Sequence, residues 1–481
     1  MRYNRNLTVI AAGLALLLSN CGPAVEEPTR ADIQSVLEKI SGSALGFRIE
    51  TADADIGIAP LSGGRGDFEI TLNNPSLSIG EKIFRQLDLP VRDFKLPVAF
   101  QELVLSYRPS DARLRVLSAR EMSYTLDMAD FIQAEESGEE GETVSMVPEM
   151  RIRYRIGSMR MENLDITPLL DEEERTVLEE LIGLLGANPA WTGSIGDMRV
   201  DIEADNDDLK RLTWTADAAE SRLAAHPELL KTVLQPDESA TSLEQLLEKG
   251  QSLWDMKAGL KNMRMSLETA KESIEVELGN LDIAYFLDPA ENNASYKFGF
   301  NWDVGGFFLT GLKQKAVEKM AGLERLNIGF SMDGLSPTFL RSYFGMLQTA
   351  RKAGMAQDDA ARQEMGMQGL ALVGSLAQSK PTISLSVRPF EHRIGKMEAE
   401  GNFRFIRMGP PIGKGTVRIF NLEEVGKALA AEKIIPEDKV ADIMTKLEGL
   451  FQREGRDGVL TFEIKQDDTK HFYLNGRPMS F

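Results

Sequence analysis

Residues 195–204 read IGDMRVDIEA, and this stretch contains the two patterns that decide the fold. From Met198 onward apolar and polar residues alternate, so that Met198, Val200, Ile202 and Ala204 lie on one side of an extended chain. Period-two alternation is typical of a β-strand with one apolar face and one face in water, which is common in antiparallel sheets. The stretch therefore predicts an amphipathic antiparallel strand.

The same alternation recurs in five further segments. They are MRMSL (263–267), LDIAYFL (281–287), LNIGFSM (326–332), TISLSV (382–387) and LTFEIK (460–465). Between them lie stretches whose apolar residues are three and four apart, which is the spacing of an amphipathic helix. We therefore expect an α+β fold, in which helices pack on an extended, twisted antiparallel β-sheet of amphipathic strands.

Several strands share an opening in which two apolar residues stand three apart and the next follows after two. The copies are IGSMRM (156–161), IGDMRV (195–200), LKNMRM (260–265), LGNLDI (278–283) and LERLNI (323–328). This change of spacing indicates a bend or a β-bulge leading into each strand. The copies begin 39, 65, 18 and 45 residues apart, which argues against a regular solenoid. The alternative is that amphipathic strands look alike without sharing a structural device.

Helical spacing and residues typical of helix starts place the helices between these strands. We predict helices over residues 29–40, 171–187, 226–257, 335–378 and 421–452. We expect the chain to divide into an N-terminal leader (1–20), argued below to be a signal peptide, a tether (21–30), an N-terminal β-rich region (31–205), a middle α+β region (206–335) and a C-terminal α+β region (336–481). The most apolar later stretch, MGMQGLALVGSLA (365–377), is too short and too interrupted by glycine for a membrane span.

The N-terminus has the pattern of an export signal. Arg2 and Arg5 precede the apolar run LTVIAAGLALLLS (7–19), which is shorter than the roughly 20 residues of a membrane span. The run leads to Cys21, the only cysteine among 481 residues. A single cysteine forms no internal disulfide, so its position directly after an export signal indicates a covalent modification.

The run LSNC (18–21) resembles the end of a bacterial lipoprotein signal, in which the cysteine is lipidated and becomes residue one. Asn20 departs from the pattern, because a small residue is usual before the cysteine. The resemblance implies that acyl chains on Cys21 hold the protein on a membrane. Ordinary cleavage after Ala24 and an uncleaved anchor are the alternatives. Gly22 stands where an aspartate would retain a lipoprotein at the inner membrane, which implies the outer membrane, facing the periplasm.

The charge of the chain argues against nucleic acid as a partner. The formal net charge is −19, and because residues 1–20 contribute +2, the rest of the chain carries −21. Such a surface repels the phosphates of nucleic acids. The near-absence of cysteine fits a reducing compartment or an envelope protein that does not depend on disulfides.

The residues offer no pattern typical of catalysis. His226, His392 and His471 are far apart and none has the spacing of a metal ligand. The segment GPPIGKGT (409–416) lacks the spacing of a phosphate-binding loop and precedes a strand, TVRIF, rather than a helix. We therefore predict no catalytic residue, no metal site and no cofactor.

Methionine is unusually frequent, with 21 residues, and many of them fall on the apolar sides of the predicted strands. Methionine is flexible and polarizable, so it fills irregular cores and also lines accommodating apolar surfaces. Core packing is one interpretation, and a groove for acyl chains or another apolar ligand is the other. The predicted groove residues are Met159, Met161, Met198, Val200, Met263, Met265, Leu281, Ile283, Leu326 and Ile328.

The C-terminal third carries a second resemblance. The segments DGLSPTFLRSYF (333–344), PTISLSVRPF (381–390), GTVRIFNLEEVGKALA (415–430) and GVLTFEIKQDDTKHFYLNGRPM (458–479) resemble the bacterial YdgA-like envelope proteins, which are also compared with the AsmA-like group. The resemblance implies an exported, membrane-anchored protein, and the AsmA-like relatives are linked to lipid traffic or outer-membrane upkeep. These families usually have an N-terminal membrane helix, where this chain has a lipoprotein-like signal. The resemblance brings no catalytic residues.

Two functions remain open at this point, and a hydrolytic enzyme is a third alternative that no sequence pattern favours. The first is a non-enzymatic, membrane-anchored periplasmic lipoprotein whose curved sheet binds lipid or another apolar ligand. The second is a structural or protein-interaction envelope lipoprotein, without a ligand, whose sheet is covered by its own helices. Whether the apolar side of the strands is open or filled distinguishes them.

Overall fold

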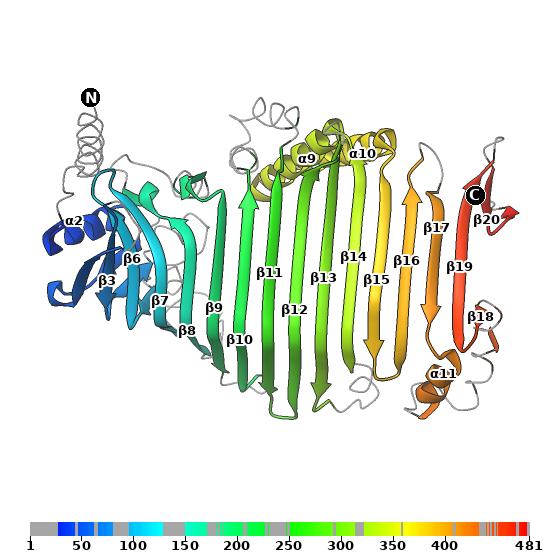
Figure 1. Ribbon diagram of the computed structural model, residues 1–481, viewed down its shortest axis with the longest axis horizontal. Coiled ribbons are helices and arrows are strands. Elements are labelled where there is room, and N and C mark those ends of the chain that lie inside the picture. The colour runs from blue at the N-terminus through cyan, green and yellow to red at the C-terminus, as the bar shows by residue number, and fades with distance from the viewer. Residues whose placement is uncertain are drawn as a thin grey trace, which may run out of the picture.

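In the computed structural model, the described strands form a single antiparallel sheet (Figure 1). Residues 27–478 are described, except 44–46, 62–65, 80–95, 128–149, 205–208, 292–294, 313–321, 357–358, 407–409, 468–470 and most of 171–187, 227–250 and 432–450. The sheet is open and long, and its central strands follow one another in the order of the sequence.

Long strands build the central part of the sheet, and consecutive members of the set pair with each other. They are β7 (Arg113–Asp127), β8 (Met150–Asp165), β9 (Ala190–Ala204), β10 (Arg211–Ala225), β11 (Trp254–Glu268), β12 (Ser273–Pro289), β13 (Tyr296–Thr310), β14 (Leu323–Leu335), β15 (Thr382–His392), β16 (Gly395–Arg404) and β17 (Ile412–Ile419). Every alternating segment predicted from the sequence lies within one of the described strands. Among the described residues open antiparallel sheet dominates, and the helical part is small.

Short strands complete the C-terminal edge. β19 (Asp457–Gln466) pairs with β17, while β18 (Gln452–Glu454), β20 (Phe472–Leu474) and β21 (Arg477–Pro478) extend the pairing beyond it. Short edge strands limit the backbone that is open to pairing with another chain.

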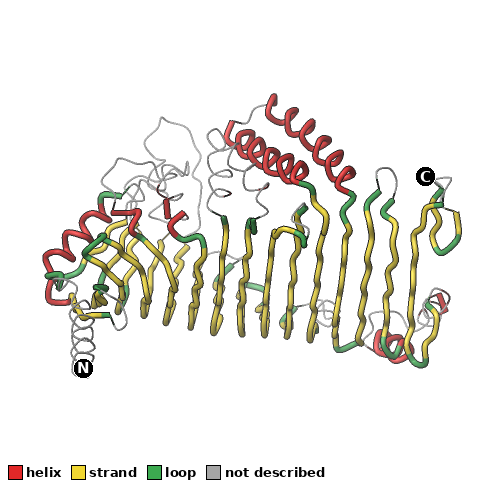
Figure 2. Tube along the Cα trace, turned by 45° about the horizontal axis from the view of Figure 1, so that its top comes forward, coloured by secondary structure: helices red, strands yellow, loops and turns green. Residues whose placement is uncertain are grey.

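The N-terminal end of the sheet is curled and carries a helix (Figure 2). Its short strands and turns are β1 (Phe47–Glu50), η1 (Asp53–Asp55), β2 (Ile56–Pro60), β3 (Phe68–Asn73), β4 (Ser76–Ile79), β5 (Leu96–Ala99), β6 (Glu102–Arg108) and η2 (Thr167–Leu170). The helix α2 (Arg30–Ser41) packs against this curled end, which confirms the helix predicted over 29–40.

A capping box begins α2, and one apolar side of the helix is buried. The backbone N–H of Asp32 donates to Thr29 Oγ1 at 3.2 Å, and the backbone N–H of Thr29 donates to Asp32 Oδ2 at 2.8 Å. Ile33, Leu37 and Ile40 are each at most 2% exposed. They share a core with strand residues of β2, β3, β5, β6 and β7.

A line of backbone irregularities, here called the seam, crosses the sheet from β7 to β14. It consists of one residue in each strand at which the cross-strand pairing skips. These residues are Glu121, Gly157, Asp197, Asp217, Asn262, Gly279, Gly306 and Glu324. In every second strand the seam residue is left-handed, with φ of 46° at Glu121, 53° at Asp197, 50° at Asn262 and 65° at Gly306.

The seam explains the shared opening of the strands. In a regular strand, residues three apart face opposite sides. Here Ile195 and Met198 flank Asp197 and lie in one apolar cluster, together with Leu260 and Met263, which flank Asn262. An irregularity is therefore present at each copy, but it lies within the strands rather than leading into them as predicted. It keeps the apolar residues on both sides of the seam on one face of the sheet.

The three other long helices that the structure describes lie at two ends of the strands. α9 (Pro337–Ala356) and α10 (Asp359–Ser379) form a hairpin over the upper ends of the central strands, and α11 (Leu422–Ala431) lies at the lower end near β16 and β17 (Figure 1). The helix predicted over 335–378 is thus two helices. Of the helix predicted over 421–452 the structure describes mainly α11.

One predicted helix is wrong at its C-terminal end. The prediction over 226–257 runs into β11, which begins at Trp254 and continues the alternation through Met256 and Ala258. Most of that predicted helix, like most of the one over 171–187, lies outside the described residues.

Hydrogen bonding between strands continues across both predicted region boundaries. β9 pairs with β10 across residues 205–206, and β14 pairs with β15 across residues 335–336. The described strands of the three predicted regions therefore share one sheet.

Candidate functional site

One face of the sheet, here called the apolar face, presents a continuous track of apolar side chains. Residues directly opposite one another in antiparallel strands share a face. One such row across the strands consists of Met159, Ile195, Ala219, Leu260, Leu281, Val304, Leu326, Phe390, Met397 and Ile419. Further apolar rows run parallel to it on the same face.

The structure places all ten predicted groove residues on this face. Met159, Leu281 and Leu326 belong to the row above, and the next row contains Met161, Ile283 and Ile328. Met198 and Met263 lie across the seam in the same apolar cluster as Met159, and Val200 and Met265 flank Trp214 on neighbouring strands. Met198 is buried in that cluster, while the other nine are partly exposed.

All four tryptophans of the chain also lie on the apolar face. Trp191 is opposite Leu223 and Trp254 is opposite Leu287, while Trp214 and Trp302 stand in rows with Val200 and Ile283. Their placement follows from strand register, because the seam keeps the face constant along each strand. Trp302 and Trp254 are each 38% exposed, so large aromatic surface is open to the surroundings.

An aromatic patch occupies the middle of this face. The Phe300 ring lies 5.2 Å from the Phe330 ring, 5.5 Å from the Trp302 ring and 6.0 Å from the Tyr285 ring, measured between centroids. Contacts at these distances are favourable between aromatic rings. Sequence reasoning did not include the tryptophans or Phe300. The alternation in YKFGFNWDV (296–304) is the signal that identifies β13 and its aromatic side.

Helices and other buried segments cover parts of the apolar face, and between them some of the described side chains are exposed. At the N-terminal end α2 buries the curled strands, and in the upper part of the sheet Leu340 and Phe344 of α9 pack with Tyr296 and Leu335. At the lower C-terminal end an apolar pocket of about 290 Å³ lies between α11 and the sheet, lined by Val425 among others. Between these contacts Leu385 is 44% exposed.

The opposite face is polar and its charges are largely paired. Arg199 Nε lies 2.6 Å from Asp201 Oδ2, and Arg325 Nη2 lies 3.0 Å from Asp303 Oδ2. The hydrogen bond from Arg199 is the main reason that the pKa of Asp201 lies below its ordinary value. A shallow hollow of about 500 Å³ on this face is lined by side chains of both charge signs, including Arg222 and Glu220. This face therefore has the character of an ordinary solvated surface.

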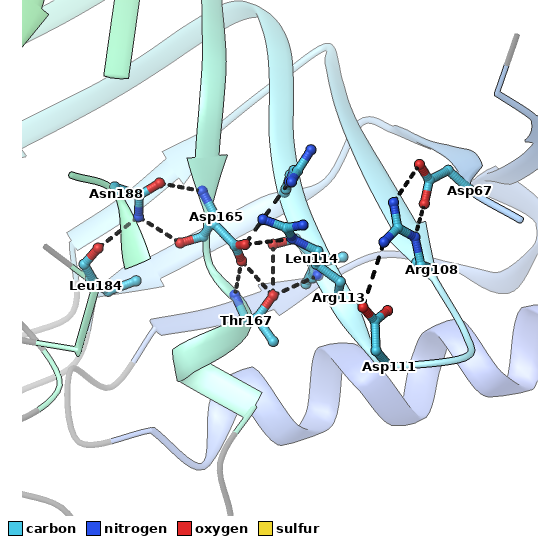
Figure 3. A network of polar contacts seen from close by, with 10 residues as sticks. Asp67, Arg108, Asp111, Arg113, Leu114, Asp165, Thr167, Leu184 and Asn188 are labelled. Carbon is cyan, nitrogen blue, oxygen red and sulfur yellow. Dashed lines mark hydrogen bonds and ion pairs between the residues drawn. The ribbon is translucent and has the colours of Figure 1, made fainter. Parts of the chain in front are cut away.

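A buried polar network fixes the junction between the curled end and the long strands (Figure 3). Asp165, 7% exposed, accepts from Arg113 Nε at 2.8 Å and from the Thr167 backbone N–H at 3.0 Å. Asn188 accepts from the Asp165 backbone N–H at 2.6 Å and donates to its carbonyl at 2.7 Å. Burial raises the pKa of Asp165, but the hydrogen bonds from Thr167 and Arg113 together lower it by more. The pKa therefore lies below its ordinary value.

One histidine, His392, lies on the apolar face: it lines the pocket beside α11, and its ring stacks on Phe390 with 6.3 Å between the centroids. Cys21 is outside the described residues. His226 follows β10, His392 ends β15 and His471 precedes β20, so the described elements do not bring the three together. Within the described residues there is no group of three or more His, Cys, Asp or Glu side chains that could hold a metal ion. No helix among the described residues is both long and apolar enough to cross a membrane.

The fold and this site define a class of protein: an open, one-sided antiparallel sheet that presents an apolar face between covering helices. Comparison with known proteins adds no closer assignment, since no family model, no curated protein and no solved structure matches the chain.

Proposed function

We propose that this protein is a non-enzymatic envelope lipoprotein that binds the acyl chains of lipid on its apolar face. The observation that carries the proposal is the continuity of that face. At the usual strand spacing the track from β8 to β19 is about 50 Å wide. Contiguous apolar patches of more than a few hundred Å² are rare on soluble monomers and indicate a partner or ligand that covers them.

Hydrocarbon suits this surface better than peptide. In the interior of a sheet the backbone N–H and C=O groups are already paired between strands, so a ligand on the face finds apolar contact and few hydrogen bonds. Methionines such as Met159 and Met263 add flexible side chains that adapt to ligands of varied shape. A fatty acyl chain needs this kind of contact and no polar partner along its length.

The proposed location follows from the N-terminal signal. Lipidation of Cys21 anchors the protein in the membrane, and Gly22 favours the outer membrane facing the periplasm. The partners are then the membrane itself, through the anchor, and a lipid or another envelope protein. The resemblance to AsmA-like proteins supports a role in envelope maintenance.

Tryptophan fluorescence tests lipid binding directly, because all four tryptophans lie on the apolar face. Residues 21–481 with Cys21→Ser contain every described helix and strand and lack the signal and any acyl chain. We expect a fatty acid brominated along its chain to quench this fluorescence in a saturable manner, and an unbrominated fatty acid to compete. A lack of saturable quenching, together with a lipid-free preparation by mass spectrometry, contradicts the proposal.

The covering helices favour one second function, a structural or protein-interaction lipoprotein without a ligand. α2 and α9 already bury two parts of the apolar face. If a protein partner rather than lipid covers the open part, the quenching experiment gives no binding while the face remains exposed to a hydrophobic dye.

A further inference from the structure

The outer side of α10 exposes a second apolar surface, separate from the apolar face of the sheet. Leu370 is 75% exposed, Val373 65% and Met367 63%. Leu385, on the sheet, follows at 44%. The spacing of 367, 370 and 373 places these three side chains along one side of the helix. The most exposed large apolar side chains that the structure describes therefore form one stripe.

This stripe belongs to a helix that is well fixed on its other side. Ser375 is buried, and Leu376 packs on the cluster that contains Leu340 and Phe344 of α9. Ser379 Oγ donates to Ser336 Oγ at 2.6 Å, which links the end of α10 to the start of α9. The exposure of the stripe is thus a consequence of how α10 is oriented.

The net charge of the hairpin sequence differs from that of the whole chain. Residues 365–379 contain no charged side chain. Over 337–380 the basic residues are Arg341, Arg351, Lys352, Arg362 and Lys380, against the acidic Asp358, Asp359 and Glu364. The hairpin sequence is therefore net positive, whereas the chain has a net charge of −19. An anionic phospholipid surface attracts such a segment and repels most of the remaining chain.

We propose that the α9–α10 hairpin docks on the surface of a phospholipid bilayer, with the exposed side of α10 in the interfacial region. Because α10 is held to α9 and the sheet on one side and exposes apolar side chains on the other, it can enter a membrane only from the surface, in the plane of the membrane rather than across it. The uncharged length of 15 residues is shorter than the roughly 20 residues of a span. The contact is independent of Cys21 and of any lipid held on the sheet.

Docking of the α9–α10 hairpin on a bilayer would also position the apolar face of the sheet relative to that bilayer. Leu340 and Phe344 of α9 pack on Tyr296 and Leu335 at the upper end of the apolar face. A bilayer beneath α10 is therefore brought next to that end of the apolar track. If the proposed function holds, docking places the lipid-binding face beside its source or destination of lipid.

Vesicle flotation tests the docking. Residues 21–481 with Cys21→Ser are mixed with vesicles of phosphatidylcholine, with or without phosphatidylglycerol. We expect binding that increases with phosphatidylglycerol and decreases with salt. Leu370→Asp should lower the partition coefficient about tenfold, because it removes one large apolar side chain from the interface and adds a negative charge. Val373→Asp, a second variant on the stripe, should act in the same direction.

Leu474→Asp is the matched control, since Leu474 is an exposed leucine at the far edge of the sheet. It should bind vesicles like the parent. Absence of binding by the parent overturns the proposal, and so does an equal loss in Leu474→Asp. A parent dimer in light scattering that Leu370→Asp dissociates identifies a second copy as the occupant and also overturns it. Quenching by dispersed brominated fatty acid should persist in Leu370→Asp, which separates this proposal from lipid binding on the sheet.

Discussion

The indole nitrogen of Trp302 donates a hydrogen bond of 3.0 Å to the hydroxyl oxygen of Tyr285 on the neighbouring strand. The rings meet at an angle of 74°, with 6.5 Å between their centroids. Trp302 therefore satisfies its one polar atom within the protein. The partly exposed ring of Trp302 offers apolar surface to a ligand. When a ligand covers the ring, the indole N–H is still paired with Tyr285.

Removing the acceptor should lower stability slightly. We expect Tyr285→Phe to reduce the free energy of unfolding by about 0.5–1 kcal/mol, because the indole N–H loses its partner but water reaches it in part. Urea denaturation measures the difference. Tyr343→Phe on α9 is the control, and we expect almost no change there. Equal effects in the two variants would show that the bond to Trp302 contributes nothing.

A charge on the apolar face should weaken lipid binding without unfolding the sheet. We expect Leu385→Asp to lower the affinity for brominated fatty acid about tenfold or more, because an acyl chain that covers the new carboxylate would have to remove it from water. Since Leu385 is 44% exposed, the cost in stability should be below about 1 kcal/mol. Ser384→Asp places the same charge on the opposite face and should leave affinity unchanged. Unaltered binding in Leu385→Asp would remove this part of the face from the site.

The strands and their common face could be predicted from sequence because both follow from the spacing of apolar residues along the chain. The alternation after Met198 predicts β9, and the spacing of three before it predicts the seam. β10 is harder to find, since Thr213, Ala216 and Ser221 give little contrast between its sides. The seam in β10 lies in Ala216–Ala219, where alanines replace the larger apolar residues of the other copies.

Coverage of the face depends on tertiary contacts that spacing does not encode. Leu340 and Phe344 have the pattern of any buried helix side, and nothing in the sequence says which end of the sheet they meet. The same applies to the exposure of Leu370, because a run of apolar residues in a helix reads as core. Trp254 shows a different error: the predicted helix over 226–257 includes it, although it is the first residue of β11.

The seam should be sensitive to the type of residue at its left-handed positions. Asn262 has φ of 50°, a conformation that asparagine and glycine tolerate and β-branched residues do not. We expect Asn262→Val to lower the free energy of unfolding by about 1–2 kcal/mol, and Asn262→Gly by less than about 0.5 kcal/mol. Both variants lose the 2.8 Å bond from Asn262 Nδ2 to Asp217 Oδ2, so their difference isolates the backbone strain. Lys257→Val, elsewhere in β11, should not destabilise.

The network around Asp165 should make stability depend on pH. Because the pKa of Asp165 is lowered in the folded state, its contribution is complete above the ordinary aspartate pKa and is lost as the pH falls through the folded-state pKa. We expect Asp165→Asn to cost about 2 kcal/mol near neutral pH, through loss of the charge-assisted bond from Arg113. The difference from the parent should shrink in acid, as measured by denaturation across pH.

Asp111→Asn is the control for this measurement. Asp111 is exposed and lies 3.6 Å from Arg108, which pairs more closely with Asp67. Such surface contacts contribute at most about 1 kcal/mol. A difference between parent and Asp165→Asn that stays constant with pH would mean that the carboxylate charge of Asp165 is not what stabilises the junction.

Two proposed membrane contacts, Cys21 and α10, should act independently in cells. Cys21→Ala should abolish incorporation of a labelled fatty acid and shift much of the protein from the membrane fraction to the soluble fraction, because acyl chains supply the stable anchor. If α10 docks as well, a salt-sensitive part should remain on the membrane, and adding Leu370→Asp should release it. Leu474→Asp in the same background should not. A Cys21→Ala protein that is processed, labelled and membrane-bound like the parent would refute the lipid anchor. The N-terminal segment would then be an ordinary cleaved signal peptide or an uncleaved membrane anchor.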